Sequence, residues 1–495
     1  MMQCRMLNQV PRELNQWKNN LSYEIGGLFQ YVGHLPSLVD IIPNVSAIQA
    51  LINYWDPDAS VFRFGMCELT PTLEELEGLL QVPGKGSPMI YPSGGTRKQF
   101  CRFLGLRNNS LDQHPDARSC PLRFLYDRFG EKESFERHQI DFFITKGQWE
   151  EKRVQAFGLV LINLLLFPQR HGKVTFATIN MIQNLFLGIQ EATPTLIPVV
   201  IADIFSALTN CQRKGGFFYA SNLVLQMWIM EHLAKRSLNP MGSCLPVENW
   251  IGSHRERVGR YYRVMSSSQF IEEFNNLTPE KVQWVLDWTK VRDPTFRTTQ
   301  HDFIPLAGVN GLVAYIPQRV MRQFGYPQSI PMVQGVEVLR LGTVTESRSM
   351  VLEAWGNLRG LENLQLELVN KMAPAVMPGY NEWIKQRVEH DSARQQSAPA
   401  SPEEQMEKLR EELEESQAQL IMANRVLEDT QVQLRREKKK NEKLEETIDA
   451  FDRIREGARK LSLGSSRESQ STSLWRHRDF VNMVTKTIDE IVKKD

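Results

Sequence analysis

Residues 403–456 read EEQMEKLREELEESQAQLIMANRVLEDTQVQLRREKKKNEKLEETIDAFDRIRE, a stretch without glycine or proline. Its side chains form a series at seven-residue spacing that is apolar except for one asparagine: Met406, Leu413, Leu420, Leu427, Leu434, Asn441 and Ile448. A second series lies three residues further on, and its large apolar members are Leu409, Leu444 and Phe451. Apolar residues every 3.5 positions form a narrow stripe that a partner helix covers. We therefore predict a coiled coil over residues 403–460, whose glycine-free part is roughly 80 Å long.

The polar members of the two series indicate how this helix associates. Asn441 favours a parallel, in-register dimer, because it pairs with its own copy inside the seam. Ser416, Thr430 and Glu437 weaken the middle of the second series. Self-association is our prediction, and pairing with a different coiled-coil protein is the alternative. A single solvated helix is less favoured, since its apolar stripe would face water.

Composition places the chain among ordinary globular proteins. At 495 residues it is long enough for two or three domains, with 41% hydrophobic and 24% charged residues. The 59 basic residues nearly cancel the 58 acidic ones, so net charge does not predict a nucleic-acid or membrane partner. The six cysteines are widely spaced, which is typical of a reducing compartment. We expect an intracellular protein of the nucleus or cytoplasm that does not span a membrane.

The region through residue 390 is expected to be a helical globular domain with a few short strands. Helix starts are well marked: in Leu69–Glu75, a threonine precedes an acidic first turn, and Thr72 with Glu75 forms a capping box. Thr278-Pro279 predicts a second such start. Apolar periodicity predicts further helices over residues 151–166, 179–189, 197–208 and 221–234. Strands are expected at residues 61–64 and 311–316. The fold class is therefore mainly α, followed by a long coiled-coil helix.

Composition shifts suggest the domain boundaries. Residues 1–390 form the helical domain, and residues 391–402, rich in Ser, Ala, Gln and Pro, form a flexible linker. The coiled coil occupies residues 403–460. Residues 461–473 are rich in serine and are expected to be disordered, and residues 474–495 are expected to form a short amphipathic helix.

The sequence contains no strong motif for catalysis, metal binding or phosphate binding. Asp56 and Asp58 suggest paired carboxylates, but without a nearby histidine a proline turn capped by the aspartate is favoured. The loop around Lys85 lacks the spacing of a phosphate-binding loop. We identify no catalytic residues, no metal ligands and no cofactor, and we expect the protein not to be an enzyme.

Two basic clusters are candidates for contacts with nucleic acid. Residues 435–440 read RREKKK. Most of these charged residues occupy positions outside the coiled-coil seam, and charged residues are normal at such positions. The second cluster interleaves arginines with aromatic residues, an arrangement that grips phosphates and stacks on bases. Its arginines are Arg255, Arg257, Arg260 and Arg263. A surface helix with an aromatic anchor explains the same pattern and is favoured.

Two separated stretches resemble a known family. Residues 54–76 contain YWDP, FRFG and ELTPTLEEL, and residues 315–331 read YIPQRVMRQFGYPQSIP. Together they resemble the plant mobile domain and its relatives, which are plant-specific and associated with retrotransposons. The resemblance covers roughly residues 20–340. It implies a helical domain, a plant source and a link to mobile elements or their silencing in the nucleus.

The second stretch also carries candidate contact residues. Arg319, Arg322 and Gln323 are expected on one helical face, with Gly325 ending the helix. Arg319 and Arg322 are candidates for contact with phosphate or with a partner's carboxylate. We therefore expect a non-enzymatic plant protein of retroelement-associated origin that associates through its coiled coil. The alternative is a nucleic-acid-binding protein linked to transposable elements or their silencing.

Overall fold

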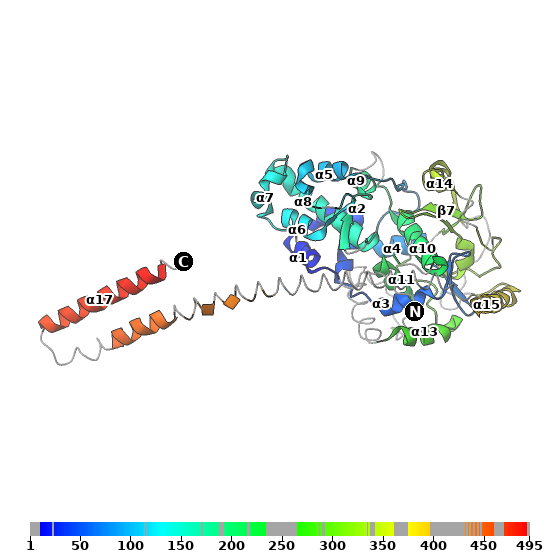
Figure 1. Cartoon of the computed structure of the whole chain (residues 1–495). Helices are drawn as coiled ribbons and strands as arrows, with labels where there is room; N and C mark the ends of the chain where they lie inside the picture. The colour runs from blue at the N-terminus through cyan, green and yellow to red at the C-terminus, as the bar shows by residue number, and fades with distance from the viewer. Residues whose placement is uncertain are drawn as a thin grey trace, which may run out of the picture. The chain divides into compact units, whose positions relative to one another are not determined.

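The computed structural model shows a mainly helical chain with a few short strands, as expected (Figure 1). It describes residues 10–21, 24–112, 114, 116–169, 172–187, 193–214, 218–233, 265–286, 288–289, 293–333, 335–336, 342–360, 375–396, 431, 434, 437–438, 441–442, 445, 448–459 and 470–492. The chain divides into two compact units, Met1–Ala398 and Pro399–Asp495, here called the N-terminal and C-terminal units. Each is described by itself.

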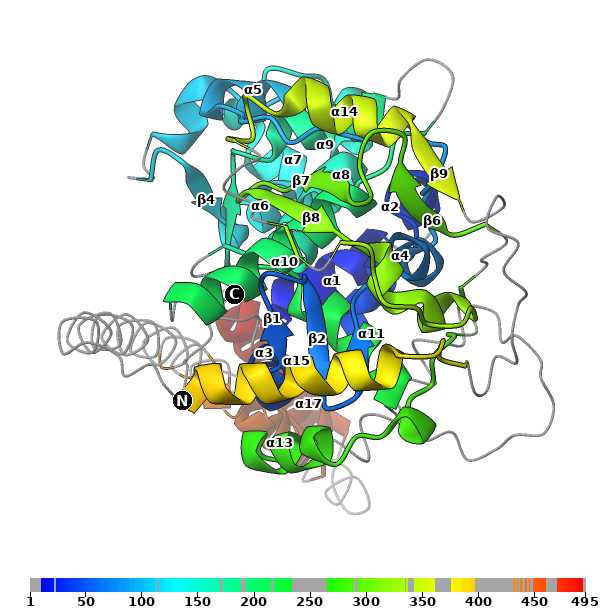
Figure 2. The same cartoon turned by 90° about the vertical axis from the view of Figure 1, so that its right-hand side faces the viewer.

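The helices of the N-terminal unit are mostly short. The α-helices are α1 (Arg12–Leu21), α2 (Phe29–Val32), α3 (Val45–Ile52), α4 (Leu73–Leu80), α5 (Arg97–Leu104), α6 (Leu122–Phe129), α7 (Ser134–Arg137), α8 (Lys146–Leu161), α9 (Ile179–Leu187), α10 (Ile197–Lys214), α11 (Asn222–Leu233), α13 (Ser267–Asn275), α14 (Arg348–Gly356) and α15 (Tyr380–Gln396). Short segments of other helix types are η1 (Glu24–Leu28), η2 (Leu35–Asp40), η3 (Asn108–Leu111), η4 (Gln139–Asp141), η5 (Ile162–Leu166) and η7 (Pro279–Lys281), and a longer 3-10 segment is η8 (Pro317–Phe324). Helix α15 crosses the near side of the unit in Figure 2.

The strands pair in small antiparallel sheets. A three-stranded meander contains β1 (Trp55–Asp56), β2 (Val61–Phe64) and β3 (Cys67–Leu69), with Phe62 opposite both Trp55 and Leu69. Two-stranded pairs join β4 (Ser119–Pro121) to β5 (Lys173–Thr175), β6 (Thr295–Thr298) to β9 (Leu358–Gly360), and β7 (Ile304–Ala307) to β8 (Leu312–Tyr315). The strand expected at residues 61–64 is β2, and all four of its residues are buried. The strand lies inside the unit instead of at its surface.

The centre of the N-terminal unit is formed by helices that are apolar on most sides. In α11 every residue from Asn222 to His232 is buried, as in a helix enclosed by other elements. The apolar run at the end of α8 continues into η5 and is also buried. Its one polar member, Asn163, donates to the Leu159 carbonyl and accepts from the Thr178 hydroxyl. This run is therefore a core helix, within the helix expected over residues 151–166.

Local capping explains where several helices begin. The Thr72 hydroxyl accepts from the Glu75 backbone N–H at 3.1 Å, and the Glu75 carboxylate accepts from the Thr72 N–H at 3.1 Å. This confirms the expected capping box at the start of α4. The helix expected after Thr278-Pro279 is reduced to the single turn η7, because the Gln283 N–H donates to the His232 carbonyl at 2.8 Å. That contact takes the backbone out of the helical path.

The C-terminal unit contains helical residues 448–459 and helix α17 (Gln470–Val492). A Cβ atom on Gly457 would lie 2.7 Å from Met483 Cε and 3.0 Å from Phe480 Cε2, so the two helical segments pack closely here. Among the described residues, no helix is long and apolar enough to cross a membrane.

Two expected boundaries differ from the structure. Helix α15 continues through Gln396, so the first residues of the expected 391–402 linker are helical; they include neither glycine nor proline. Helix α17 begins at Gln470, inside the expected serine-rich linker, because serine and threonine are favourable near helix starts. The predicted seam residues Met406, Leu409, Leu413, Leu420, Leu427 and Leu444 lie outside the described residues.

Candidate functional site

A buried polar junction joins the two stretches that resemble the plant mobile domain. Its centre is the Glu68 carboxylate on β3, which accepts from Arg63 on β2 and from Arg319 on η8. Arg63 Nε lies 3.1 Å from Glu68 Oε1, and Arg319 Nε lies 3.1 Å from Glu68 Oε2. Arg319 Nη2 makes a further hydrogen bond to Oε1. The Glu68 and Arg319 side chains are fully buried.

A second carboxylate, Asp56, balances the charge of Arg63. Arg63 Nη2 donates to Asp56 Oδ2 at 2.6 Å. Burial alone would raise the pKa of Asp56, but the Arg63 charge and the backbone N–H groups of Ala59 and Asp58 hold that pKa below its usual value. Burial would likewise lower the pKa of Arg63, and the Glu68 and Asp56 charges raise it instead. Both side chains of this pair are therefore stabilised in their charged forms.

Gln323 on η8 binds the backbone of the first stretch as a neighbouring strand would. Its Oε1 accepts from the Thr70 N–H at 2.9 Å, and its Nε2 donates to the Thr70 carbonyl at 2.9 Å. The same Nε2 lies 2.9 Å from both carboxylate oxygens of Glu75. The expected C-terminal stop at Gly325 is confirmed, with φ 80° and its N–H bonded to the Arg322 and Met321 carbonyls. However, η8 is a 3-10 segment kinked at Val320.

Glu75 connects this junction to the central helix α11. Trp228 Nε1 donates to Glu75 Oε2 at 2.8 Å, and His232 Nε2 lies 3.2 Å from Glu75 Oε1. His232 Nδ1 lies 2.7 Å from the Gln283 carbonyl, which only accepts, so Nδ1 carries a proton. The imidazole thus lies between the Gln283 carbonyl and the Glu75 carboxylate.

Aromatic rings of α15 and the ring of Trp284 lie against Arg319 and Arg322. The Arg319 guanidinium carbon lies 5.3 Å from the Trp383 ring centroid. That of Arg322 lies 4.5 Å from Trp284 and 5.7 Å from Tyr380. These distances are typical of cation–π contacts. Within the described chain, Arg322 Nε and Nη1 have no hydrogen-bond partner, and burial lowers the pKa of this guanidinium.

The candidate contact arginines therefore fall into two groups. Arg319 is 1% exposed and Arg322 is 5% exposed, so the interpretation of these two as surface contacts for phosphate or a partner is corrected. Arg319 meets its carboxylate inside the same chain, since Glu68 is presented by β3. The other group, Arg255, Arg257, Arg260 and Arg263, lies outside the described residues.

The described seam residues of the C-terminal unit are exposed. Leu434 is 70% exposed, Ile448 55% and Phe451 61%, and Asn441 is also exposed. These four positions are helical.

Asp56 and Asp58 do not form a carboxylate pair for chemistry. Asp56 Oδ1 accepts from the Asp58 N–H at 2.9 Å and from the Ala59 N–H at 3.1 Å, which is the expected capped turn. Asp58 pairs instead with Arg213. Within the described residues, no group of three or more His, Cys, Asp or Glu is placed to hold a metal ion.

The described cysteine thiols are also poorly suited to nucleophilic chemistry. Cys67, Cys101, Cys120 and Cys211 are buried. Burial raises the pKa of Cys67 to about 12 and also raises the pKa of Cys101 and Cys120. At neutral pH the thiols of Cys67, Cys101 and Cys120 therefore carry their proton, and the thiolate is the nucleophilic form.

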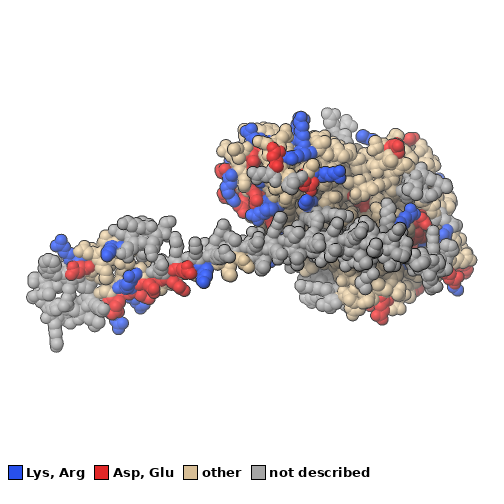
Figure 3. All heavy atoms as spheres, in the orientation of Figure 1, with Lys and Arg blue, Asp and Glu red and all other residues tan. Residues whose placement is uncertain are grey.

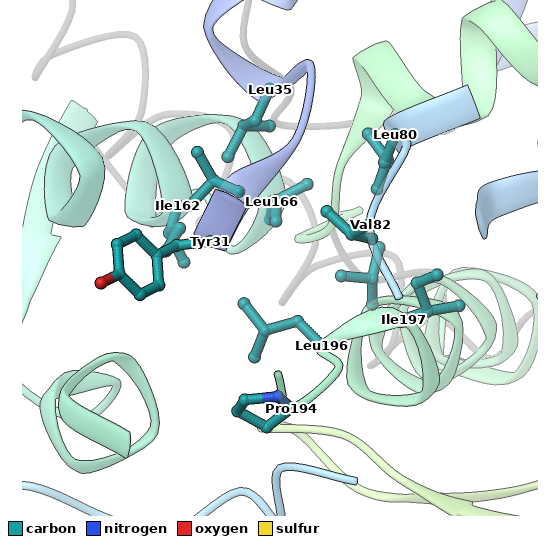
Figure 4. A pocket seen from close by; sticks show the side chains of 11 residues that line it. Tyr31, Leu35, Leu80, Val82, Ile162, Leu166, Pro194, Leu196 and Ile197 are labelled. Carbon is teal, nitrogen blue, oxygen red and sulfur yellow. The ribbon is translucent and has the colours of Figure 1, made fainter. Parts of the chain in front are cut away.

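An enclosed cavity lies between η2, η5 and the start of α10 (Figure 4). Its volume is about 20 Å³, close to the minimum for one water molecule. The lining is aliphatic apart from Pro194 and Tyr31, and Figure 4 shows the Tyr31 hydroxyl pointing away from the centre. This space is a packing void and not a ligand site.

A more open groove of about 810 Å³ lies beside the start of α5. Its basic lining residues are Arg97, Arg118 and Lys173. Arg97 pairs with Asp112 at 2.6 Å and Lys173 with Asp116 at 2.9 Å, so two of these charges are neutralised locally. On the face shown in Figure 3, the basic and acidic side chains of the described N-terminal unit are interspersed.

Sequence reasoning missed the part of the junction on α11. Gln226, Glu231 and His232 are polar residues in an otherwise apolar helix, and all three are buried. A buried polar residue requires a partner, so their presence in this segment was an available signal. The partner of His232, Glu75, is not identifiable from local sequence, and Gln226 instead bonds to the backbone of Ile42 and Asn44.

A mainly helical domain in which these two motifs meet at one buried junction defines the class: the chain is a plant mobile domain-like protein. It belongs to the family described as Domain of unknown function (DUF7745), which matches residues 14–389. It is similar to Protein MAIN-LIKE 1 of Arabidopsis thaliana, with 24% identity over 363 residues that cover 69% of this chain and 66% of that relative. The chain thus spans just under two thirds of the length of the curated relative it matches. No solved structure matches it.

Proposed function

We propose that this protein is a non-enzymatic interaction protein of retroelement-associated origin that self-associates through its C-terminal coiled coil. In this proposal the N-terminal unit is a stable helical domain, and the C-terminal helix joins copies of it.

The exposed seam is the observation that carries the proposal. Leu434, Ile448 and Phe451 are large apolar side chains, each more than half exposed, on helical backbone. Their spacing of fourteen and then three residues matches the heptad pattern of the whole 403–456 stretch. Apolar side chains repeated on one helical stripe are buried by another helix in coiled coils. A second copy supplies such a helix.

The buried junction supports the non-enzymatic part of the proposal. The most distinctive polar residues of the N-terminal unit bind one another inside the domain, with Glu68 between Arg63 and Arg319. Glu75 is likewise occupied by Gln323, Trp228 and His232. Catalytic groups need access to substrate, and these groups are enclosed. Their chemistry is therefore structural.

We predict that the full-length protein is a dimer and that Ile448→Glu with Phe451→Glu makes it monomeric. Two charges in the seam cannot be buried against a partner without a large free-energy penalty. Light scattering after size-exclusion chromatography measures the mass.

Arg453→Glu is the matched control, because Arg453 is exposed on the same helix but lies off the seam. It should remain dimeric, as should the wild type. A monomeric wild-type protein, with or without residues 403–456, would refute self-association.

Nucleic-acid binding is the second candidate, and the arginine–aromatic pattern at residues 254–263 favours it. If phosphate contacts dominate, affinity for single-stranded DNA should fall steeply between 50 and 200 mM salt, on the order of tenfold or more. Arg257→Ala with Arg260→Ala should weaken binding across all sequences and reduce the salt dependence. Fluorescence anisotropy measures both effects. Binding that ignores salt and these two substitutions would dismiss this candidate.

A further inference from the structure

Arg322 is a buried cation that no carboxylate of the described chain neutralises. Four arginines are buried among the described residues: Arg63, Arg153, Arg319 and Arg322. The first three each bind a carboxylate, Arg153 through Glu24 at 3.2 Å and the other two through Glu68. Arg322 forms no ion pair with any residue that the structure describes. The exposed Glu280 acts on it only through its charge at a distance.

The contacts of Arg322 stabilise its charge but leave its N–H donors unused. Its guanidinium carbon lies 4.5 Å from the Trp284 ring centroid and 5.7 Å from that of Tyr380. Such cation–π contacts act on the charge of the guanidinium and do not replace its hydrogen bonds. Nε and Nη1 are enclosed and have no hydrogen-bond partner among the described residues. An enclosed donor without an acceptor costs free energy, and an anion bound there would remove that cost.

The chemistry of this group favours a carboxylate as the anion. A guanidinium presents its N–H groups in a planar fork that matches two carboxylate oxygens, and one carboxylate neutralises one guanidinium. A phosphate dianion would bring a second negative charge, and Arg319 on the same η8 segment is already occupied by Glu68. Arg322 keeps 5% of its surface exposed, so the enclosure is not closed to solvent.

We propose that Arg322 is a binding site for the carboxylate of another molecule, which enters the enclosure formed by Trp284 and Tyr380. Arg322 is thus not a surface contact, because the ligand must enter the enclosure to reach its donors. An acidic side chain of a partner protein and a small carboxylic acid share this chemistry. The proposal is independent of self-association, because every residue of the site belongs to the N-terminal unit.

Sodium acetate is the probe for this site in the full-length protein. Relative to sodium chloride at the same ionic strength, acetate should shift the midpoint of urea unfolding upward, because a ligand of the folded state stabilises it. Arg322→Gln should abolish this difference, since glutamine lacks the charge and the fork. Arg348→Gln is the matched control, because Arg348 also lies over an aromatic ring, 5.5 Å from the Tyr91 centroid, but is exposed. It should respond to acetate as the wild type does.

A direct measurement on the wild type covers the case in which Arg322→Gln does not fold. Saturation-transfer NMR should detect bound acetate, and formate should displace it whereas chloride should not. The blocked peptide N-acetyl-Gly-Glu-Gly-amide distinguishes the two sources. Displacement of acetate by this peptide supports an acidic side chain as the ligand, and displacement by free acids alone supports a small carboxylic acid.

Three outcomes would overturn the proposal. The first is an unfolding midpoint that responds equally to acetate and chloride, or an acetate response that Arg322→Gln retains. The second is wild-type protein that shows no saturation transfer to acetate, or from which chloride displaces it. The third is displacement of acetate by phosphate more strongly than by formate, which would refute the choice of a carboxylate.

Discussion

The Glu68 carboxylate accepts hydrogen bonds from both Arg63 and Arg319, and all three side chains lie in the interior. A buried ion pair often adds little net stability relative to apolar side chains, but removal of one partner leaves a charge without compensation. Glu68 compensates two cations at once. At the scale of single residues, this carboxylate is the position on which the junction depends most.

Glu68→Gln should therefore destabilise the domain by about 3 kcal/mol or more. The substitution preserves shape and removes only the charge between the two guanidinium groups. The midpoint of urea unfolding, followed by tryptophan fluorescence, measures the change.

Lys18→Ala provides the comparison, because the Lys18–Asp40 pair at 2.7 Å is partly exposed. Its loss should change stability by less than about 1 kcal/mol. Equal, small effects of both substitutions would show that the junction is not a structural centre.

At the scale of elements, helix α10 and the β7–β8 hairpin are joined through a buried acid. Asp203 Oδ1 accepts from the Asn310 N–H at 3.0 Å, whereas Oδ2 has no hydrogen-bond partner among the described residues. Burial raises the pKa of Asp203 to about 7, against the lowering effect of the Asn310 and Val309 N–H groups. This raised pKa makes the contact between the two elements dependent on pH.

Asp203→Asn should stabilise the domain at pH 8 but not at pH 4. In the unfolded chain the carboxyl ionises near pH 4, whereas in the folded domain it keeps its proton up to about pH 7. The wild type therefore loses stability as pH rises from about 4 to 7, on the order of 2–4 kcal/mol from this group. Asparagine does not titrate and retains an oxygen acceptor.

Paired urea titrations at pH 4.5, 6 and 8 measure this difference. The advantage of the variant should grow with pH through this window. An advantage that is constant across pH, or that shrinks as pH rises, would contradict the assignment of a raised pKa to Asp203.

At the scale of the whole molecule, the chain combines a helical domain that belongs to the family with a C-terminal unit in which Leu434, Ile448 and Phe451 are exposed. The two motifs that indicate the family lie far apart in sequence and meet at one place in the N-terminal unit. Each stretch completes hydrogen bonds of the other.

The sequence by itself determined the features that depend on neighbouring residues. Thr72 and Glu75 are three positions apart, so their capping box and the start of α4 followed from local order. The same is true of the Gly325 stop and of the capped turn at Asp56. The heptad spacing also identified a stripe whose described members are exposed.

Only the tertiary structure decided which side of the molecule each polar residue faces. Arg319 and Arg322 are charged residues of a type usually found at the surface. They lie inside because distant segments bring Glu68 to Arg319, and Trp284 and Tyr380 to Arg322. His232 likewise lies beside Glu75, which comes from a distant segment of the chain. Helix caps and heptads are set by interactions over a few residues, whereas a buried ion pair requires two remote segments to exclude water together. That exclusion is a property of the assembled core, and no local pattern contains it.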